Sequence, residues 1–241
     1  MKQTKTFGII GAMESEVTLL ISRLQNAETM RVFDLNFHRG TLGNHTLVIV
    51  QSGIGKVSAA RCAQILIDRF SPDYLINTGV AGGVGEGLSV GDFVVGTELV
   101  QHDFDLSYFG HARGYFPGFG EADDRETAFR ADGAVVEAFC RAAAEFLPAS
   151  RVHRGRIATG DQFIAGKESK RVLRERFGAL AAEMEGGAIA QTAQMSGVPF
   201  VVVRAISDLA DGTAVDSFQT FERETANLSA TILERFMHDF S

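Results

Sequence analysis

Three acidic side chains follow apolar runs of this 241-residue chain, at points where strands are expected to end. Glu16 lies one turn beyond the first run, Glu185 lies in the segment Glu183-Met184-Glu185, and Asp208 closes the last run. Open α/β sheets bind ligands at that edge, where carboxyl groups can give or take protons. Each acid alone has a structural explanation, as a first-turn helix charge, a helix-start acid or an N-cap. The grouping is therefore more informative than any one member.

Glycine-rich turns do not match the common nucleotide-binding patterns. The dinucleotide pattern G-x-G-x-x-G fails at Gly8–Gly11 and within Gly79–Gly91. The triphosphate pattern fails around Gly55-Lys56, because Val50 replaces its leading glycine and Val57 replaces its Ser or Thr. We therefore expect neither class of ligand.

A metal site is also not expected. The histidines form no H-E-x-x-H pair, and the nearest candidate is His102-Asp103 with Asp105. At strand spacing Asp103 and Asp105 would share one face, which could hold a cation or line a subunit boundary.

Composition excludes several classes of protein. Hydrophobic residues make up 45% and charged residues 22%, and the formal charge is −7, as in ordinary globular proteins. No cluster of Lys and Arg favours nucleic acid or an anionic membrane, and no apolar run reaches the ~18 residues of a membrane span. Cys62 and Cys140 read as reduced thiols, and Met1–Phe7 does not resemble a signal peptide. We expect a cytoplasmic protein.

Apolar patterning predicts alternating strands and helices, and hence an α/β fold in one domain spanning residues 1–241. The expected strands are Thr6–Met13, Phe33–Gly40, His45–Gln51, Asp73–Asn77, Asp92–Gly96, Leu99–Phe104, Arg151–Thr159 and Val198–Ser207. The expected helices are Glu14–Leu24, Val57–Phe70, Asp132–Phe146, Lys167–Phe177, Glu183–Ser196 and Ser217–Met237. Residues 107–130 form a long loop, which suggests a lid or a subunit contact.

Ordered motifs from about Phe7 to about Phe221 resemble those of the 5′-methylthioadenosine/S-adenosylhomocysteine nucleosidases, a branch of the purine nucleoside phosphorylase superfamily. The motifs are Gly8–Val17, Ser52–Val57, Asn77–Gly83, Val90–Asp92, Gly160–Ile164, Glu183–Glu185 and Val201–Asp208. The resemblance implies a nucleoside phosphorylase-like fold of three layers, αβα, with a central mixed β-sheet. It also implies hydrolysis of both named nucleosides, and of 5′-deoxyadenosine, with no cofactor.

The resemblance assigns roles to the three acids. Asp208 corresponds to the general acid at adenine N7, Glu16 to the group that activates water, and Glu185 to the acceptor for ribose hydroxyls. Such an acid must hold a proton near neutral pH, so we expect burial or a nearby carboxylate to raise the pKa of Asp208.

Further residues are implied to bind the substrate. Phe163 would stack on the purine while the backbone of Ile164 reads its edge. Ser207 and Arg204 would orient the carboxylates, although Arg204 has a structural alternative as a buried counter-ion for Glu16 or Glu185. The rest of the implied substrate-binding set is Met13, Ile54, Val80, Ala81, Gly82, Glu183, Met184 and Phe218.

The long loop is implied to close the alkylthio pocket of a partner subunit, which predicts a homodimer. The corresponding residues are Leu106, Phe109, His111 and Pro117. His111 departs from the tyrosine often found there. Val80 departs from the serine of some relatives, which puts one hydroxyl contact in doubt.

Water is expected as the nucleophile, because Asn77 and Val80 stand where superfamily phosphorylases carry phosphate-binding Arg and Ser. A futalosine or aminodeoxyfutalosine hydrolase on the same scaffold is the alternative within this chemistry. A non-catalytic nucleoside-binding module is the alternative outside it.

Overall fold

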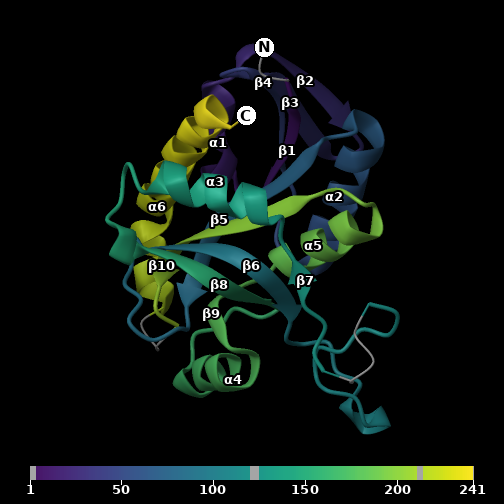
Figure 1. Ribbon diagram of the computed structural model, residues 1–241, viewed down its shortest axis with the longest axis vertical. Helices are drawn as coiled ribbons and strands as arrows, with labels where there is room; N and C mark the ends of the chain where they lie inside the picture. The colour runs from purple at the N-terminus through teal and green to yellow at the C-terminus, as the bar shows by residue number, and fades with distance from the viewer. Residues whose placement is uncertain (1–3, 120–124, 211–213, 241) are drawn as a thin grey trace.

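A mixed β-sheet runs through the molecule, with helices on both faces (Figure 1). The computed structural model describes residues 4–119, 125–210 and 214–240, without the side chains of 214–220 and 222. The strands are β1 (Thr6–Gly11), β2 (Gln25–Val32), β3 (Leu35–Leu42), β4 (His45–Gln51), β5 (Tyr74–Gly83), β6 (Phe93–Gln101), β7 (Phe129–Arg130), β8 (Val152–Thr159), β9 (Ala179–Glu183) and β10 (Phe200–Asp208). The α-helices are α1 (Glu14–Ser22), α2 (Lys56–Phe70), α3 (Gly133–Ala143), α4 (Lys167–Phe177), α5 (Gly186–Met195) and α6 (Ala214–Asp239).

The sheet has an open half and a half that closes on itself. In the open half β1 runs parallel to β4 and β5, and the antiparallel pairs β4–β3 and β3–β2 extend it to an edge. In the other half β5 pairs with β10, β10 with β6, β6 with β8, β8 with β9, and β9 with the end of β5. The ends of β1, β5, β9 and β10 are therefore close together.

Two large apolar cores and a smaller one beside α4 lie between the sheet and its helices. One large core contains Phe7 and Ile9 of β1 with residues of α1, α3 and α6, and the other contains Ile10 with residues of α2 and α5. Alternate residues of β1 face opposite cores, as expected of a parallel strand buried on both sides. Figure 1 shows α1, α3 and α6 on one face and α2 and α5 on the other. This arrangement confirms the three-layer α/β fold.

Several element boundaries were predicted wrongly. The predicted strands Asp92–Gly96 and Leu99–Phe104 are one strand, β6, and the strand predicted to end at Asn77 continues to Gly83. Glycines inside buried, paired strands produced both errors, because the sequence pattern treats glycine as a turn signal. Strands β2 and β9 were missed: β2 is almost wholly exposed and lacks an apolar face, and β9 is a short run of alanine and leucine.

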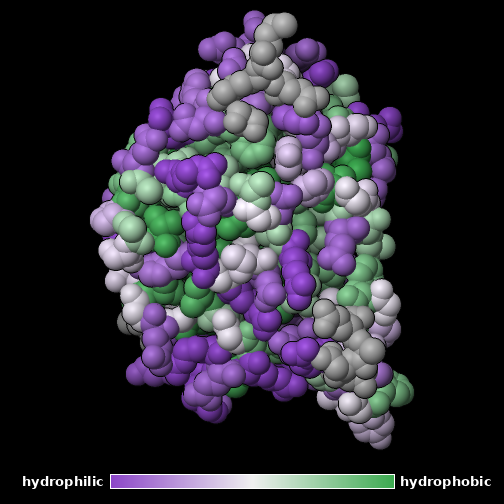
Figure 2. Space-filling model, in the orientation of Figure 1, coloured by the Kyte–Doolittle hydropathy of each residue, from purple (hydrophilic) through white to green (hydrophobic). Residues whose placement is uncertain are grey.

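The described residues between β6 and β7, which include Ser107–Phe109, project from the body of the molecule (Figure 1). The base of this segment is an aromatic cluster in which Phe104 stacks on Phe116, which in turn contacts Phe129. At its tip the side chains of Tyr108 and Phe109 are exposed. In Figure 2 hydrophobic residues lie at the lower right, where this segment projects. Among the described residues, no helix combines the length and apolarity that a bilayer span requires.

Candidate active site

The three acids predicted from the sequence lie around one pocket of about 370 Å³. The pocket lies at the ends of β1, β5, β9 and β10, so the sheet brings together residues far apart in the sequence. Its lining includes most of the predicted substrate-binding set: Met13, Glu16, Ile54, Val80, Ala81, Gly82, Phe163, Glu183, Met184, Glu185, Ser207 and Asp208.

Glu16 is held by backbone N–H groups from the turn after β1 and from within β5. One carboxylate oxygen accepts from Ala12 at 2.7 Å and Met13 at 3.0 Å, and the other accepts from Val80 at 3.0 Å. A side chain at Gly79 would place its Cβ 2.5 Å from the carboxylate, so this approach requires glycine. Burial raises the pKa of Glu16, although the Arg204 charge and the three N–H groups oppose the rise. Glu16 is thus both an acidic residue in the first turn of α1 and a carboxylate in the pocket whose raised pKa makes it a stronger proton acceptor.

Glu183 anchors the floor of the pocket. It accepts hydrogen bonds from the Thr159 hydroxyl, from the Arg204 guanidinium and from the backbone N–H groups of Glu185 and Gly186. Arg204 also donates to Asn77. Arg204 is also a buried counter-charge for Glu16 and Glu185, as the structural alternative expected, because its charge opposes the rise of both pKa values. The direct ion pair of Arg204 is with Glu183, the last residue of β9.

Glu185 has fewer stabilising contacts than Glu183. The backbone N–H of Gly55 donates to its Oε1 at 2.8 Å. Burial raises the pKa of Glu185 to about 7, and the charges of Glu183 and Glu16 add to this effect, while Arg204 and the Gly55 N–H oppose it. The segment 183–185 does not start a helix as predicted, because Glu183 ends β9 and Glu185 is the N-cap of α5.

Asp208 ends β10 with only 1% of its surface exposed. One oxygen accepts from the backbone N–H of Ala210 at 2.9 Å, and the other accepts from the Ser207 hydroxyl at 3.1 Å. Because α6 begins at Ala214, Asp208 is not the N-cap of that helix. The carboxyl group therefore reaches the pocket from a rigid strand end and has hydrogen-bonding neighbours on both oxygens.

The walls of the pocket are apolar. Met13, Ile54 and Met184 line it together with Phe163. The Phe163 side chain is 50% exposed and that of Ile54 is 57% exposed, although both residues are hydrophobic. An exposed aromatic ring beside buried carboxylates suits a flat ligand that also carries polar groups.

Comparison with known proteins identifies the family of this chain. The family model described as Phosphorylase superfamily matches residues 6–238. A 5′-methylthioadenosine/S-adenosylhomocysteine nucleosidase of an Exiguobacterium species is 47% identical over 226 residues, covering 92% of this chain and 93% of that relative. The chain belongs to this nucleosidase family.

Solved structures agree with that membership. The Neisseria meningitidis nucleosidase in complex with methylthio-immucillin-A matches with a TM-score of 0.92 and 40% identity, covering 98% of this chain and 100% of that one. A structure described as a futalosine hydrolase mutant of Helicobacter pylori matches with a TM-score of 0.89 and 33% identity, covering 97% and 98% of the two chains.

Some residues expected in the nucleosidase site do not line this pocket. Ile164 is buried in a small core with Leu173 and Phe177, and Arg204 lies behind Glu183. The side chain of Phe218 lies outside the described part of the chain. The residues expected to serve a partner subunit lie on the projecting segment: Leu106, Phe109, His111, which stacks on Tyr115, and Pro117.

Sequence reasoning on the nucleosidase motifs missed two lining residues. Ala12 and Ala182 contribute small surfaces to the pocket. Ala12 precedes Met13 in the same turn, so its position was a usable signal, whereas Ala182 belongs to the missed strand β9. Asp103 and Asp105 follow the end of β6, so the predicted strand face does not form there. No group of three or more metal-binding side chains occurs in the described ranges.

Proposed function

We propose that this nucleosidase hydrolyses the N-glycosidic bond of 5′-methylthioadenosine, S-adenosylhomocysteine and 5′-deoxyadenosine, releasing adenine. The observation that carries the proposal is the grouping of Glu16, Glu185 and Asp208 around one pocket with an exposed aromatic wall. Cleavage needs a proton for the leaving base, stabilisation of a cationic sugar and an activated water. Each acid supplies one of these needs.

Asp208 is the proposed general acid. It delivers a proton to adenine N7, so the electron pair of the breaking C1′–N9 bond passes into a neutral base. Its burial at the end of β10, in the lining of the pocket, supports this role. The Ser207 hydroxyl and the Ala210 N–H fix the direction of the carboxyl group.

Glu16 is the proposed base. It takes a proton from water as the water oxygen bonds to C1′, and its raised pKa makes it a better acceptor than an exposed glutamate. Glu185 is the proposed acceptor for ribose hydroxyls, and its negative charge favours an oxocarbenium-like sugar. Phe163 is proposed to stack on adenine, and the backbone of Ile164 to read the edge of the base.

The preference for water over phosphate has support from the scaffold. The Asn77 amide donates to the Ile10 carbonyl at 2.9 Å and accepts from Arg204, so both residues are committed to the fold. Val80 contributes a backbone N–H to Glu16 and offers no hydroxyl. A phosphate dianion near Glu16 would also be repelled.

A second copy of this chain is the proposed partner. Val57, Tyr108 and Phe109 are each more than 75% exposed, and Ile54, which lines the pocket, is 57% exposed. Exposed hydrophobic residues of this size favour burial against another protein. Leu106, Phe109, His111 and Pro117 are proposed to close the alkylthio end of the partner's pocket. Sedimentation at micromolar concentration should give twice the chain mass, and a monomer would contradict the proposal.

The test is a substrate panel of the three adenine nucleosides and aminodeoxyfutalosine, with adenine release followed for each. We expect the highest kcat/KM with 5′-methylthioadenosine or S-adenosylhomocysteine. The futalosine hydrolase reading remains the second candidate because of the structural match to such a protein, and a kcat/KM highest for aminodeoxyfutalosine would favour it. Binding without release from any substrate would indicate a non-catalytic module.

A further inference from the structure

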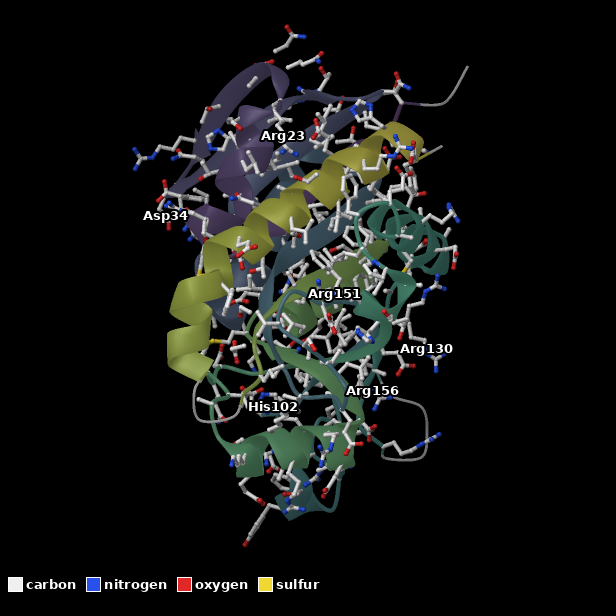
Figure 3. All side chains as sticks on the ribbon, turned by 90° about the vertical axis from the view of Figure 1, so that its left-hand side faces the viewer. Arg23, Asp34, His102, Arg130, Arg151 and Arg156 are labelled. Carbon is white, nitrogen blue, oxygen red and sulfur yellow. The ribbon has the colours of Figure 1, made fainter. Side chains whose placement is uncertain are left out.

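Three hydrogen bonds form a closed ring behind the wall of the pocket. The Lys56 ammonium donates to Asp103 at 2.6 Å, and the backbone N–H of Asp161 donates to the other oxygen of Asp103 at 2.8 Å. The backbone N–H of Lys56 donates to the Asp161 carboxylate at 2.8 Å. This Lys56–Asp103–Asp161 ring joins the start of α2, the turn after β6 and the turn after β8. Figure 3 shows His102, the neighbour of Asp103, at the lower end of the sheet next to α4.

The Lys56–Asp103 side of the ring is partly shielded from water, whereas Asp161 is exposed. The Lys56 and Asp103 side chains are 19% and 15% exposed, whereas the surface pair Arg171–Glu168 is 51% and 73% exposed. Burial opposes ionisation of Asp103, but the bonds from Lys56 and Asp161 outweigh it and hold the pKa of Asp103 below its usual value. Charge-assisted bonds in such surroundings are stronger than surface ion pairs.

Two pocket contacts lie directly beside the ring. Gly55 precedes Lys56 and donates its N–H to Glu185, in a backbone conformation with φ +93° that favours glycine. A Cβ at Gly55 would lie 3.1 Å from the Asp161 carboxylate, so the ring and the turn pack closely. Phe163 follows Asp161 by two residues and forms part of the pocket wall.

We propose that the Lys56–Asp103–Asp161 ring is a positioning device that holds Gly55 against Glu185 and holds the turn that carries Phe163. Its side chains are not among the residues that line the described pocket, so they act through these two neighbours. The inference rests on the proposed function of the site. It adds positioning residues that neither the acid grouping nor the aromatic wall contains.

The test is the Asp103→Asn variant assayed with 5′-methylthioadenosine. We expect kcat/KM to fall about tenfold, the scale of one lost charge-assisted hydrogen bond, with KM rising because Phe163 is less well placed. The acid limb of the pH profile should also move to higher pH, because Glu185 loses the N–H that favours its charged form. The charged groups that face Glu185 are Glu183, Arg204 and Glu16, and the variant leaves them unchanged.

Glu98→Gln is the matched control. Glu98 lies on β6 and pairs with Arg156, also partly buried, but away from the pocket. We expect this control to lower the melting temperature without moving the acid limb. A second comparison uses two variants of Lys56. Lys56→Met removes the positive charge and should lower the activity, whereas Lys56→Arg keeps a positive charge and should retain most of the activity. This comparison also carries the test if Asp103→Asn does not fold.

An unchanged kcat/KM and acid limb in Asp103→Asn would overturn the positioning role. Loss of activity with the acid limb unmoved, matched by an equal loss in Glu98→Gln, would also overturn it, since both would then reflect stability alone. These outcomes differ from failure of the proposed function, in which the unmodified protein releases no adenine.

Discussion

Two buried carboxylates near the end of β10, those of Asp92 and Glu185, have pKa values shifted in opposite directions. Asp92, 3% exposed, accepts hydrogen bonds from Arg151 at 2.9 Å and from the backbone of Ser89 at 3.0 Å, and lies 3.1 Å from His153. Burial opposes ionisation of Asp92, yet these partners outweigh it and lower its pKa. Glu185, 6% exposed, has its pKa raised to about 7.

The two carboxylates differ in their partners as well as in how strongly burial acts on them. Asp92 has a guanidinium (Arg151, labelled in Figure 3) and a histidine ring beside it, and its backbone pairs with Ile206 to fasten β10. The pocket acids share one buried arginine, and its guanidinium pairs with Glu183. A carboxylate with a cation of its own stabilises the fold, whereas one without can change protonation near neutral pH.

The largest contrast is expected from one chemical change at two sites. Asp208→Asn removes the proposed acid, so kcat should fall by roughly 10³-fold or more. Asp92→Asn should leave kcat within a few-fold but lower the free energy of unfolding by about 1–3 kcal/mol, since it breaks bonds to a charged group. Steady-state kinetics and urea unfolding at pH 8 measure both. A large loss of kcat in Asp92→Asn would break the distinction.

Glu16→Gln should separate chemistry from binding. The amide oxygen can still accept from Ala12 and Met13, but the amide NH2 group cannot accept from Val80, and the amide is a poor base. We expect kcat to fall about 10²-fold while KM changes little. Steady-state assays give kcat and KM, and the dissociation constant of the substrate, measured separately, checks binding. A change confined to KM would assign Glu16 to binding alone.

The pH dependence of kcat/KM should follow the pocket acids rather than Asp92. Because the proposed role of Glu185 requires its ionised form and its pKa is about 7, activity should fall about tenfold per pH unit below that value. In Glu185→Gln, whose residual activity should be low, only the decline caused by protonation of Glu16 should remain. A plateau down to pH 5 in the unmodified protein would contradict the assigned ionisation.

The smallest effect expected is a gain in stability. The folded pKa of Glu185 lies above its ordinary value of 4.5, so its stabilising contribution is complete below 4.5 and is lost as pH rises through about 7. Glu185→Gln should therefore raise the free energy of unfolding at pH 8 by about 1–3 kcal/mol, with no gain at pH 4. The Asp92 contribution has the opposite sign and is lost as pH falls below 3.8. An equal free energy of unfolding for the unmodified protein and Glu185→Gln at pH 8 would argue against a buried charge at Glu185.

The sequence predicted the pocket better than the elements around it. Glu16, Glu185 and Asp208 each follow an apolar run, and the rule that ligands bind at strand ends brings them together without exact boundaries. Strand β9 and the pairing of Arg204 with Glu183 could not be predicted, since both depend on contacts between distant segments. The Lys56–Asp103–Asp161 ring was missed for the same reason, as its members are up to 105 residues apart.

The most direct test of hydrolysis is adenine release from 5′-methylthioadenosine in phosphate-free buffer, repeated with added phosphate and with identification of the sugar product. Three carboxylates and no phosphate-binding Arg–Ser pair at Asn77 and Val80 predict the same rate in both buffers and free methylthioribose as the sugar. Release that requires phosphate and yields a sugar 1-phosphate would contradict the account, because phosphate would then replace water beside Glu16.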